Sequence, residues 1–97
     1  MSVTTAGPAP AQLTVVHTSA CHFCSDAAAA LADLATDFAL AVELVGADEP
    51  RGVTLMAAHR AAMYPLVLVD GVFFSSGRLP RKKLRKLLET RATAAVS

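Results

Sequence analysis

The chain holds only two cysteines, Cys21 and Cys24, and they stand three residues apart. They follow a short β-branched run and a Thr-Ser-Ala turn, and they open an alanine-rich stretch with apolar residues at steps of three or four. Two cysteines are too few for a disulfide framework. A Cys-x-x-Cys pair at a strand-to-helix junction is more often reactive or metal-binding than a structural staple. This junction therefore constrains both the fold and the chemistry.

Short β-branched or apolar runs predict the strands around the cysteines, and apolar residues at steps of three or four predict the helices. The expected elements are strands at 12–17, 40–45, 66–69 and 72–75, and helices at 22–38, 52–62 and 80–91. Asp70-Gly71 between the last two strands is a strong signal for a tight hairpin. In the strand at 40–45, only Glu43 is expected to face water. The last helix opens at Pro80 and has an apolar stripe of Leu84, Leu87 and Leu88.

The predicted order is β-α-β-α-β-β-α in an α/β domain. A right-handed helical crossover makes the first two strands parallel, and the hairpin adds antiparallel neighbours. The expected architecture is a mixed four-stranded sheet covered by helices. Residues 1–11 lack apolar periodicity and are interpreted as a flexible leader, 12–91 as the folded domain and 92–97 as a flexible tail.

Composition narrows the class of protein. A hydrophobic content of 54% in 97 residues is enough for one buried core. The start of the chain lacks the basic and apolar regions of a secretory signal. Acidic residues interrupt the hydrophobic middle, so no stretch is long enough to span a bilayer. We expect a cytoplasmic monomer without a membrane anchor.

Charge is distributed unevenly along the sequence. Residues 1–77 hold two basic and seven acidic side chains, whereas residues 78–97 hold seven basic side chains and Glu89. Basic and apolar residues at helical spacing usually form a solvated helix face, and the alternative is attraction of an acidic partner or an anionic substrate. Aromatic residues are scarce, at 5%, and no recognisable nucleic-acid motif occurs, so we expect no nucleic-acid partner.

The position of the cysteines indicates a specific chemistry. Cys21 is expected at or beside the helix N-cap, where unpaired N–H groups and the helix dipole stabilise a thiolate and lower its pKa. Cys24, one turn later, is then within disulfide reach and more enclosed. Cys21 would attack a disulfide and Cys24 would resolve the mixed disulfide, with no metal or organic cofactor required. A protonated His22 beside Cys21 would favour the thiolate and make the couple more oxidising.

Two alternatives remain for the same pair. Cys-x-x-Cys also serves as half of a zinc site, for which His17, His22 and His59 are the available nitrogen donors. Since there is no second such pair, a closed four-ligand site is disfavoured, but a metal or iron–sulfur binding module using an external thiol stays open. The cysteines could also be inert core residues. His17 is expected at a strand end near the pair and His59 on a helix surface, neither with a catalytic role.

A second element of interest is Met63-Tyr64-Pro65, directly before the third strand. A proline that opens a strand donates no ladder hydrogen bond and is often cis in a tight turn. A trans proline that only stops the preceding helix is the alternative from the residues alone.

Residues 12–91 resemble the glutaredoxin-like branch of the thioredoxin superfamily. The resemblance is carried by L-T-V-V-H-T-S-A-C-H-F-C, by Y-P-L-V-L-V-D-G and by S-G-R-L-P-R-K-K-L-R-K-L-L. It implies a thioredoxin-like fold, a cis Pro65 beside Cys21, and a Tyr64 backbone that pairs with an extended substrate. It also implies that Phe23 occupies the aromatic position common before the second cysteine.

The resemblance further implies dithiol–disulfide oxidoreductase activity in cell redox homeostasis and electron transport. The partners would be protein disulfides or small thiols, with glutathione possible as a co-substrate. Ser76-Gly77-Arg78 stands where glutaredoxins carry a glycine pair, and Tyr64 replaces a smaller residue. Gly77 would allow close backbone approach, or serve only as a turn, and Arg78 would meet a carboxylate. The expected substrate-binding residues are His22, Phe23, Tyr64, Pro65, Gly77 and Arg78.

Overall fold

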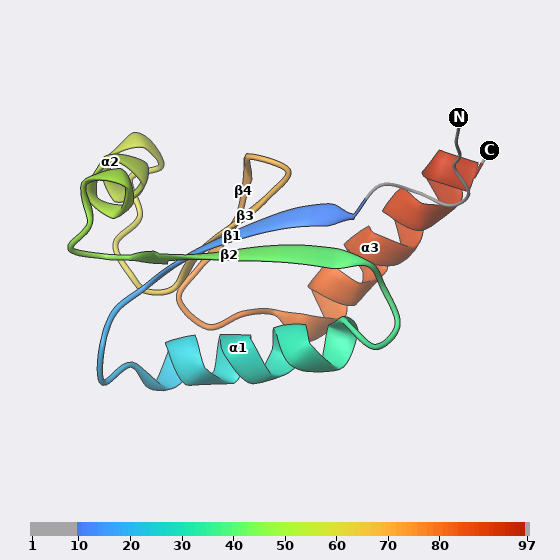
Figure 1. The fold of residues 1–97 in the computed structure, drawn as a ribbon, viewed down its shortest axis with the longest axis horizontal. Coiled ribbons are helices and arrows are strands. Elements are labelled where there is room, and N and C mark those ends of the chain that lie inside the picture. Colours follow the sequence, from blue (N-terminus) through green and yellow to red (C-terminus); the bar gives the residue numbers. More distant parts are fainter. Residues whose placement is uncertain (1–9, 97) are drawn as a thin grey trace, which may run out of the picture.

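Four strands form one mixed sheet that carries helices on both faces (Figure 1). The computed structural model describes residues 10–96, with side chains described for residues 10–91. The elements are β1 (Ala11–His17), α1 (His22–Leu34), β2 (Leu40–Gly46), α2 (Pro50–Ala58), β3 (Leu66–Val69), β4 (Val72–Ser76) and α3 (Arg81–Val96). The strand order is β2-β1-β3-β4, with β1 parallel to β2 and antiparallel to β3, and β3 antiparallel to β4. The predicted element order and the mixed sheet are confirmed.

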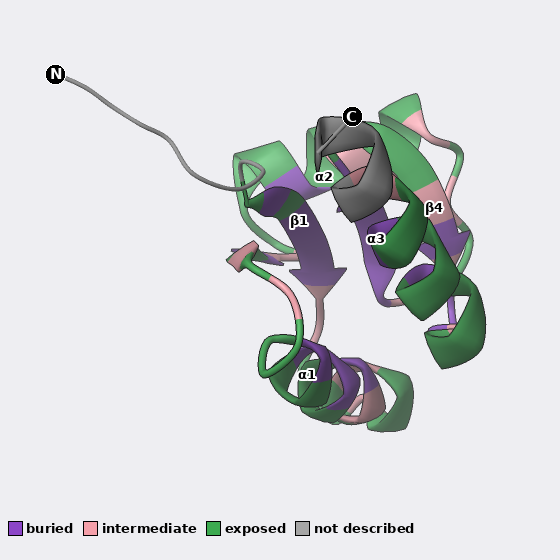
Figure 2. Ribbon diagram, turned by 90° about the vertical axis from the view of Figure 1, so that its right-hand side faces the viewer, coloured by how far each residue is buried: buried purple, intermediate pink, exposed green. Residues whose placement is uncertain are grey.

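Strand β1 lies at the centre of the core because it has neighbours on both sides and helices on both faces. Its side chains alternate between the faces, as extended backbone requires. Leu13 and Val15 join a cluster with residues of α1 and α3, whereas Val16 joins a second cluster toward α2. Figure 2 shows β1 buried along most of its length. The carboxyl end of this central strand leads into the cysteine turn.

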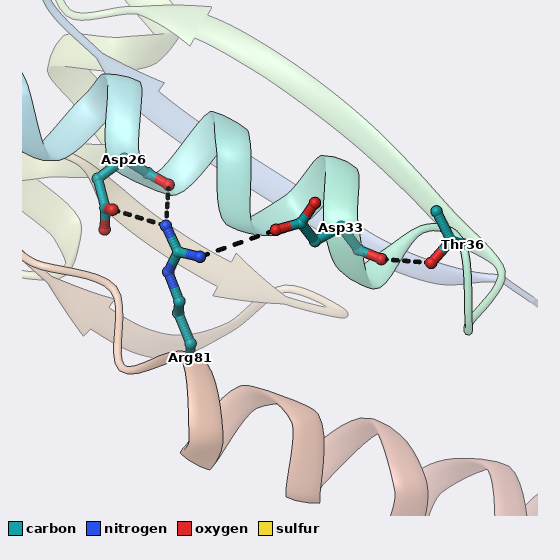
Figure 3. Close-up of polar contacts among 4 residues, drawn as sticks. All are labelled: Asp26, Asp33, Thr36 and Arg81. Carbon is teal, nitrogen blue, oxygen red and sulfur yellow. Dashed lines mark hydrogen bonds and ion pairs between the residues drawn. The ribbon is translucent and has the colours of Figure 1, made fainter.

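Ion pairs join α1 and the turn after it to α3 along their exposed sides. Arg81, in the first turn of α3, contacts the Asp26 carboxylate at 2.6 Å and lies 3.9 Å from that of Asp33 (Figure 3). One turn later, Arg85 pairs with Asp37. Two of the basic residues in the C-terminal segment are thus partners of acidic residues on α1 and in the turn that follows it. The charge asymmetry of the sequence reflects, in part, contacts within the domain.

The β3–β4 hairpin turns at Asp70-Gly71, as the sequence predicts. Both residues have positive φ, 52° and 82°, the combination that tight primed hairpin turns require. The Asp70 carboxylate accepts the Gln12 backbone N–H at 3.0 Å and the Arg91 Nε–H at 2.8 Å. These contacts lower the pKa of Asp70, with the Arg91 hydrogen bond as the largest cause. The turn is therefore tied to both β1 and α3.

Several element boundaries differ from the sequence predictions. Helix α1 ends at Leu34 instead of Phe38, because residues 35–37 form a turn in which the Thr36 hydroxyl donates to the Asp33 carbonyl at 2.7 Å. Helix α2 covers 50–58 instead of 52–62, since Pro50 occupies its first turn. Helix α3 continues to Val96, through residues interpreted as a tail. Of the expected leader, residues 1–9 lie outside the described residues, and Ala11 begins β1.

The expectation that only Glu43 of β2 faces water is wrong. Val42 is 43% exposed and Leu44 is 61% exposed. The reason is that β2 is an edge strand, paired on one side only with β1, so its apolar side chains are covered incompletely. Phe23 and Leu87, expected on the apolar stripes of α1 and α3, are also partly exposed, at 39% and 37%.

Candidate functional site

The two cysteines lie where β1 passes into α1, at one end of the sheet. Cys21 is the N-cap residue of α1, with extended backbone (φ −115°, ψ 110°). The Cys24 backbone N–H donates to Cys21 Sγ at 3.1 Å. This is the hydrogen bond that an N-cap acceptor normally makes, with sulfur in place of oxygen. The helix therefore directs both an N–H group and the positive end of its dipole at Cys21.

Cys21 and Cys24 are joined by a disulfide, with their Cα atoms 5.2 Å apart. Both residues are half-buried, so the pair is neither sealed in the core nor fully exposed. Ala20 precedes the pair with φ 52°, a left-handed conformation that turns the chain sharply into the helix. The two cysteines are therefore partly accessible to solvent, and their position is set by β1 before them and α1, which begins directly after Cys21.

The loop before β3 lies against Cys21. Cys21 Sγ is 4.0 Å from the Tyr64 carbonyl oxygen, and the Tyr64–Pro65 peptide bond is cis. The Pro65 carbonyl accepts the Gly77 N–H at 3.1 Å. Gly77 has φ 95°, and a side chain there would meet Met63 at 3.4 Å. Cys21, Tyr64, Pro65 and Gly77, far apart in sequence, thus form one chain of contacts.

Of the other three expected substrate-binding residues, two lie next to the cysteines and one lines a different hollow. His22 and Phe23 are exposed in the first turn of α1, next to the cysteines in sequence. Arg78 is exposed and lines a separate hollow with Asp26 and the first turn of α3. It is not among the residues that line the space beside the cysteines. His17 does line that space, in keeping with its expected place near the pair.

A groove of about 530 Å³ extends from the cysteines along α1. Its floor and walls come from β1, from α1 and from the exposed edge strand β2. The lining residues are Val15, His17, Thr18, Ala20, Cys21, Cys24, Ser25, Ala28, Leu31, Ala32, Ala35, Val42 and Leu44. Sequence reasoning missed most of these residues, because alanines on a helix and valine or leucine on a strand read as core. The signal that could have found them is the position of 40–45 at a sheet edge.

No group of three or more His, Cys, Asp or Glu side chains that could hold a metal ion occurs among the described residues. Among these residues, His17, His22 and His59 do not complete a metal site with Cys21 and Cys24. Within the described residues, no helix has the length and apolar character needed to cross a membrane.

A mixed β2-β1-β3-β4 sheet with helices on both faces, a cysteine pair at the first helix and a cis proline opposite it define the thioredoxin-like fold. Among solved structures, the chain is similar to an uncharacterised thioredoxin-like protein from Clostridium perfringens, with a TM-score of 0.70 at 12% identity. The match covers 93% of this chain and 77% of the other. No protein-family profile and no curated protein matches. This likeness shows that the chain has a thioredoxin-like fold.

Proposed function

We propose that the protein is a dithiol–disulfide oxidoreductase in which Cys21 is the attacking thiol and Cys24 the resolving thiol. The observation that carries the proposal is the N-cap geometry of Cys21, whose sulfur accepts the Cys24 N–H at 3.1 Å. A group that stabilises charge on this sulfur favours the thiolate, which is the nucleophile in disulfide exchange. The half-buried disulfide and the adjacent Tyr64 carbonyl support the same role.

The reaction would run in two exchange steps. The Cys21 thiolate attacks one sulfur of a substrate disulfide, forms a mixed disulfide and releases the first substrate thiol. Cys24 then attacks Cys21, restores the Cys21–Cys24 disulfide and releases the second thiol. The dipole at the start of α1 stabilises Cys21 both as nucleophile and as leaving group, since both forms are anionic. These steps require no metal or organic cofactor.

Substrate recognition in this proposal uses the loop opposite Cys21. The Tyr64 backbone would pair with an extended substrate next to the buried Pro65. Gly77, which has no side chain, would let the substrate backbone come close. His22 and Phe23 would contact the part of the substrate that projects over the first turn of α1. Arg78, which faces a different hollow, is the weakest member of the expected set. Protein disulfides and small thiols are the proposed partners, and glutathione is a candidate reductant in a cytoplasmic setting.

The test is reduction of insulin disulfides and of a glutathione mixed disulfide by the parent, Cys21→Ser and Cys24→Ser. We expect Cys21→Ser to lose both activities and Cys24→Ser to lose insulin reduction. Activity of Cys24→Ser on the glutathione adduct alone would define a monothiol route. Full activity of Cys21→Ser on either substrate would refute the assignment of the nucleophile.

The contribution of His22 is tested by the redox potential of the pair. If His22 is protonated, its positive charge beside Cys21 stabilises the reduced form, so His22→Ala is expected to lower the potential relative to the parent. The measurement is equilibration with glutathione buffers followed by thiol alkylation and mass analysis. An unchanged or higher potential would contradict a role for His22 in tuning.

The metal-binding alternative has less support. A resident site would need further ligands beside the two thiols, and no suitable cluster occurs among the described residues. Metal analysis of protein purified under reducing conditions would decide between the two functions.

A further inference from the structure

The groove beside the cysteines changes in polarity along its length. His17, Thr18 and Ser25, its polar lining residues, come from the end of β1 and the first turn of α1, next to the cysteines. Farther along α1, the lining is Ala28, Leu31, Ala32 and Ala35, with Val42 and Leu44 from β2. From Cys24 to Leu34, the last residue of α1, the helix rises about 15 Å. The groove thus has a sulfur-containing polar end and a long apolar end.

Among the residues that the structure describes, none with a carboxylate, ammonium or guanidinium group lines this groove. None of its thirteen lining residues is Asp, Glu, Lys or Arg. The acidic residues of α1 are on its other side, where Asp26 and Asp33 contact Arg81 (Figure 3). A charged occupant would lose water without gaining a partner, which is costly. An apolar occupant would instead cover Val42 and Leu44, which are 43% and 61% exposed.

From this arrangement we infer that the groove binds the chain of a dithiol carried on a neutral aliphatic arm, of the lipoyl type, and places its sulfur at Cys21. The inference rests on the proposed exchange function and specifies its electron donor. The polar end accommodates the reacting sulfur atoms, and the apolar end accommodates methylenes. A tripeptide thiol with two carboxylates and an ammonium group, such as glutathione, finds no ionic partner along this surface.

The step balances as an exchange of two electrons. One thiolate of the donor attacks Cys21 Sγ, the Cys21–Cys24 bond breaks, and Cys24 leaves as a thiolate that takes up a proton. The second donor thiol, after loss of its proton, attacks the first donor sulfur, which is bonded to Cys21 Sγ in the mixed disulfide. The new intramolecular disulfide closes the donor ring, and Cys21 leaves as a thiolate. The donor is oxidised by two electrons and the cysteine pair is reduced by two.

The experiment compares two dithiols on the oxidised full chain. Dihydrolipoamide carries the aliphatic arm, and dithiothreitol has none, so dithiothreitol reports the intrinsic reactivity of the disulfide. The second-order rate constants for reduction are measured by acid quench, alkylation and mass analysis. Burial of a methylene is worth roughly fourfold in an equilibrium constant, so two to three buried methylenes predict a preference of roughly 15- to 60-fold for dihydrolipoamide.

Substitutions in the groove provide the decisive comparison. Leu44→Glu and Ala32→Glu add a carboxylate at exposed groove positions, and Val53→Glu adds one at a 57% exposed position on α2, outside the groove. We expect both groove variants to slow dihydrolipoamide at least fivefold and dithiothreitol less than twofold. Val53→Glu should change neither rate by more than twofold, and Leu44→Met should retain the parent preference.

The outcomes separate the two proposals. If dithiothreitol reduces the pair normally but no preference for dihydrolipoamide exists, or the groove variants leave it intact, the inference is overturned and the exchange function stands. If the cysteine pair does not cycle with any dithiol, the proposed function itself fails. A leucine-flanked Cys-x-x-Cys peptide dithiol is measured as a third donor. If the groove variants slow only reduction by this peptide, the groove is a peptide site and the lipoyl-type assignment is wrong.

Discussion

Replacing Gly52 by alanine tests how closely α2 approaches the end of β2. Gly52 is buried in the first turns of α2. A Cβ atom built on it would lie 2.1 Å from the Gly46 carbonyl oxygen, 3.0 Å from the Gly46 carbonyl carbon and 3.3 Å from Ala47 Cα. All three are backbone atoms, so no side-chain rotation relieves the contact.

Two opposing effects set the size of the change. Alanine is favoured over glycine in a helix by about 1 kcal/mol, so propensity alone predicts that Gly52→Ala stabilises the protein. The new Cβ is about 0.9 Å inside the 3.0 Å limit that real Cβ contacts respect. Overpacking of a closely packed site costs about 1–3 kcal/mol, and a backbone collision is at the upper end. We expect a net loss of about 2 kcal/mol in the free energy of unfolding.

The assay is urea unfolding followed by far-UV circular dichroism, with parent and variant both oxidised. Thermal unfolding of the same samples should show a Tm lowered by roughly 8–16 °C, as expected for a loss of about 2 kcal/mol in a domain of this size. Ala57→Gly, at an exposed position of the same helix, is the reverse control and should lose up to about 1 kcal/mol through propensity alone. If Gly52→Ala is as stable as the parent or more stable, the close approach of α2 to β2 is refuted.

Two further predictions concern the hairpin and the core. Asp70→Asn keeps a residue that tolerates positive φ but removes the charge paired with Arg91. The folded-state pKa of Asp70 is lowered, so the carboxylate stabilises the fold fully above its ordinary pKa of 3.8. This stability is lost as pH falls through the folded-state pKa. We expect the variant to lose at most about 1 kcal/mol of unfolding free energy at pH 7, since the Asp70 side chain is 40% exposed. Urea unfolding at decreasing pH should show this loss shrinking below pH 3.8. A loss that stays constant with pH would contradict the stabilising role of the Asp70 charge. Leu84→Ala, at a fully buried position, should cost about 2–5 kcal/mol in the same assay, whereas Leu87→Ala at 37% exposure should cost clearly less; equal costs would rule out the assigned core.

The order of elements was predictable because each segment carries a distinct local signal. A short β-branched run marks β1, a short apolar run marks β3, apolar residues at steps of three or four mark α1, and Asp70-Gly71 marks the hairpin. The position of Cys21 at the start of α1 follows from the same signals. Helix ends were less predictable, since the turn after Leu34 depends on the Thr36 hydroxyl bonding to the Asp33 carbonyl.

The groove could not be predicted, because its existence depends on which strand lies at the sheet edge. The run from Leu40 to Val45 reads as a strand on which only Glu43 faces water. Its pairing with β1 alone leaves Val42 and Leu44 exposed beside α1. Strand order is a property of the whole chain, so no local pattern in this segment distinguishes an edge from a centre.

The acidic residues on α1 and in the turn after it give the clearest case of a pattern whose meaning depends on tertiary contacts. Asp26, Asp33 and Asp37 look like a solvated face in the sequence, and the basic C-terminal segment looks like a surface for an acidic partner. In the structure Arg81 and Arg85 of α3 contact these carboxylates. Such exposed pairs contribute little stability each, but they fix which side of α1 faces α3. The opposite side, which begins at Cys24, is left as the apolar wall of the groove, so the charge pattern helps to determine what can approach the disulfide.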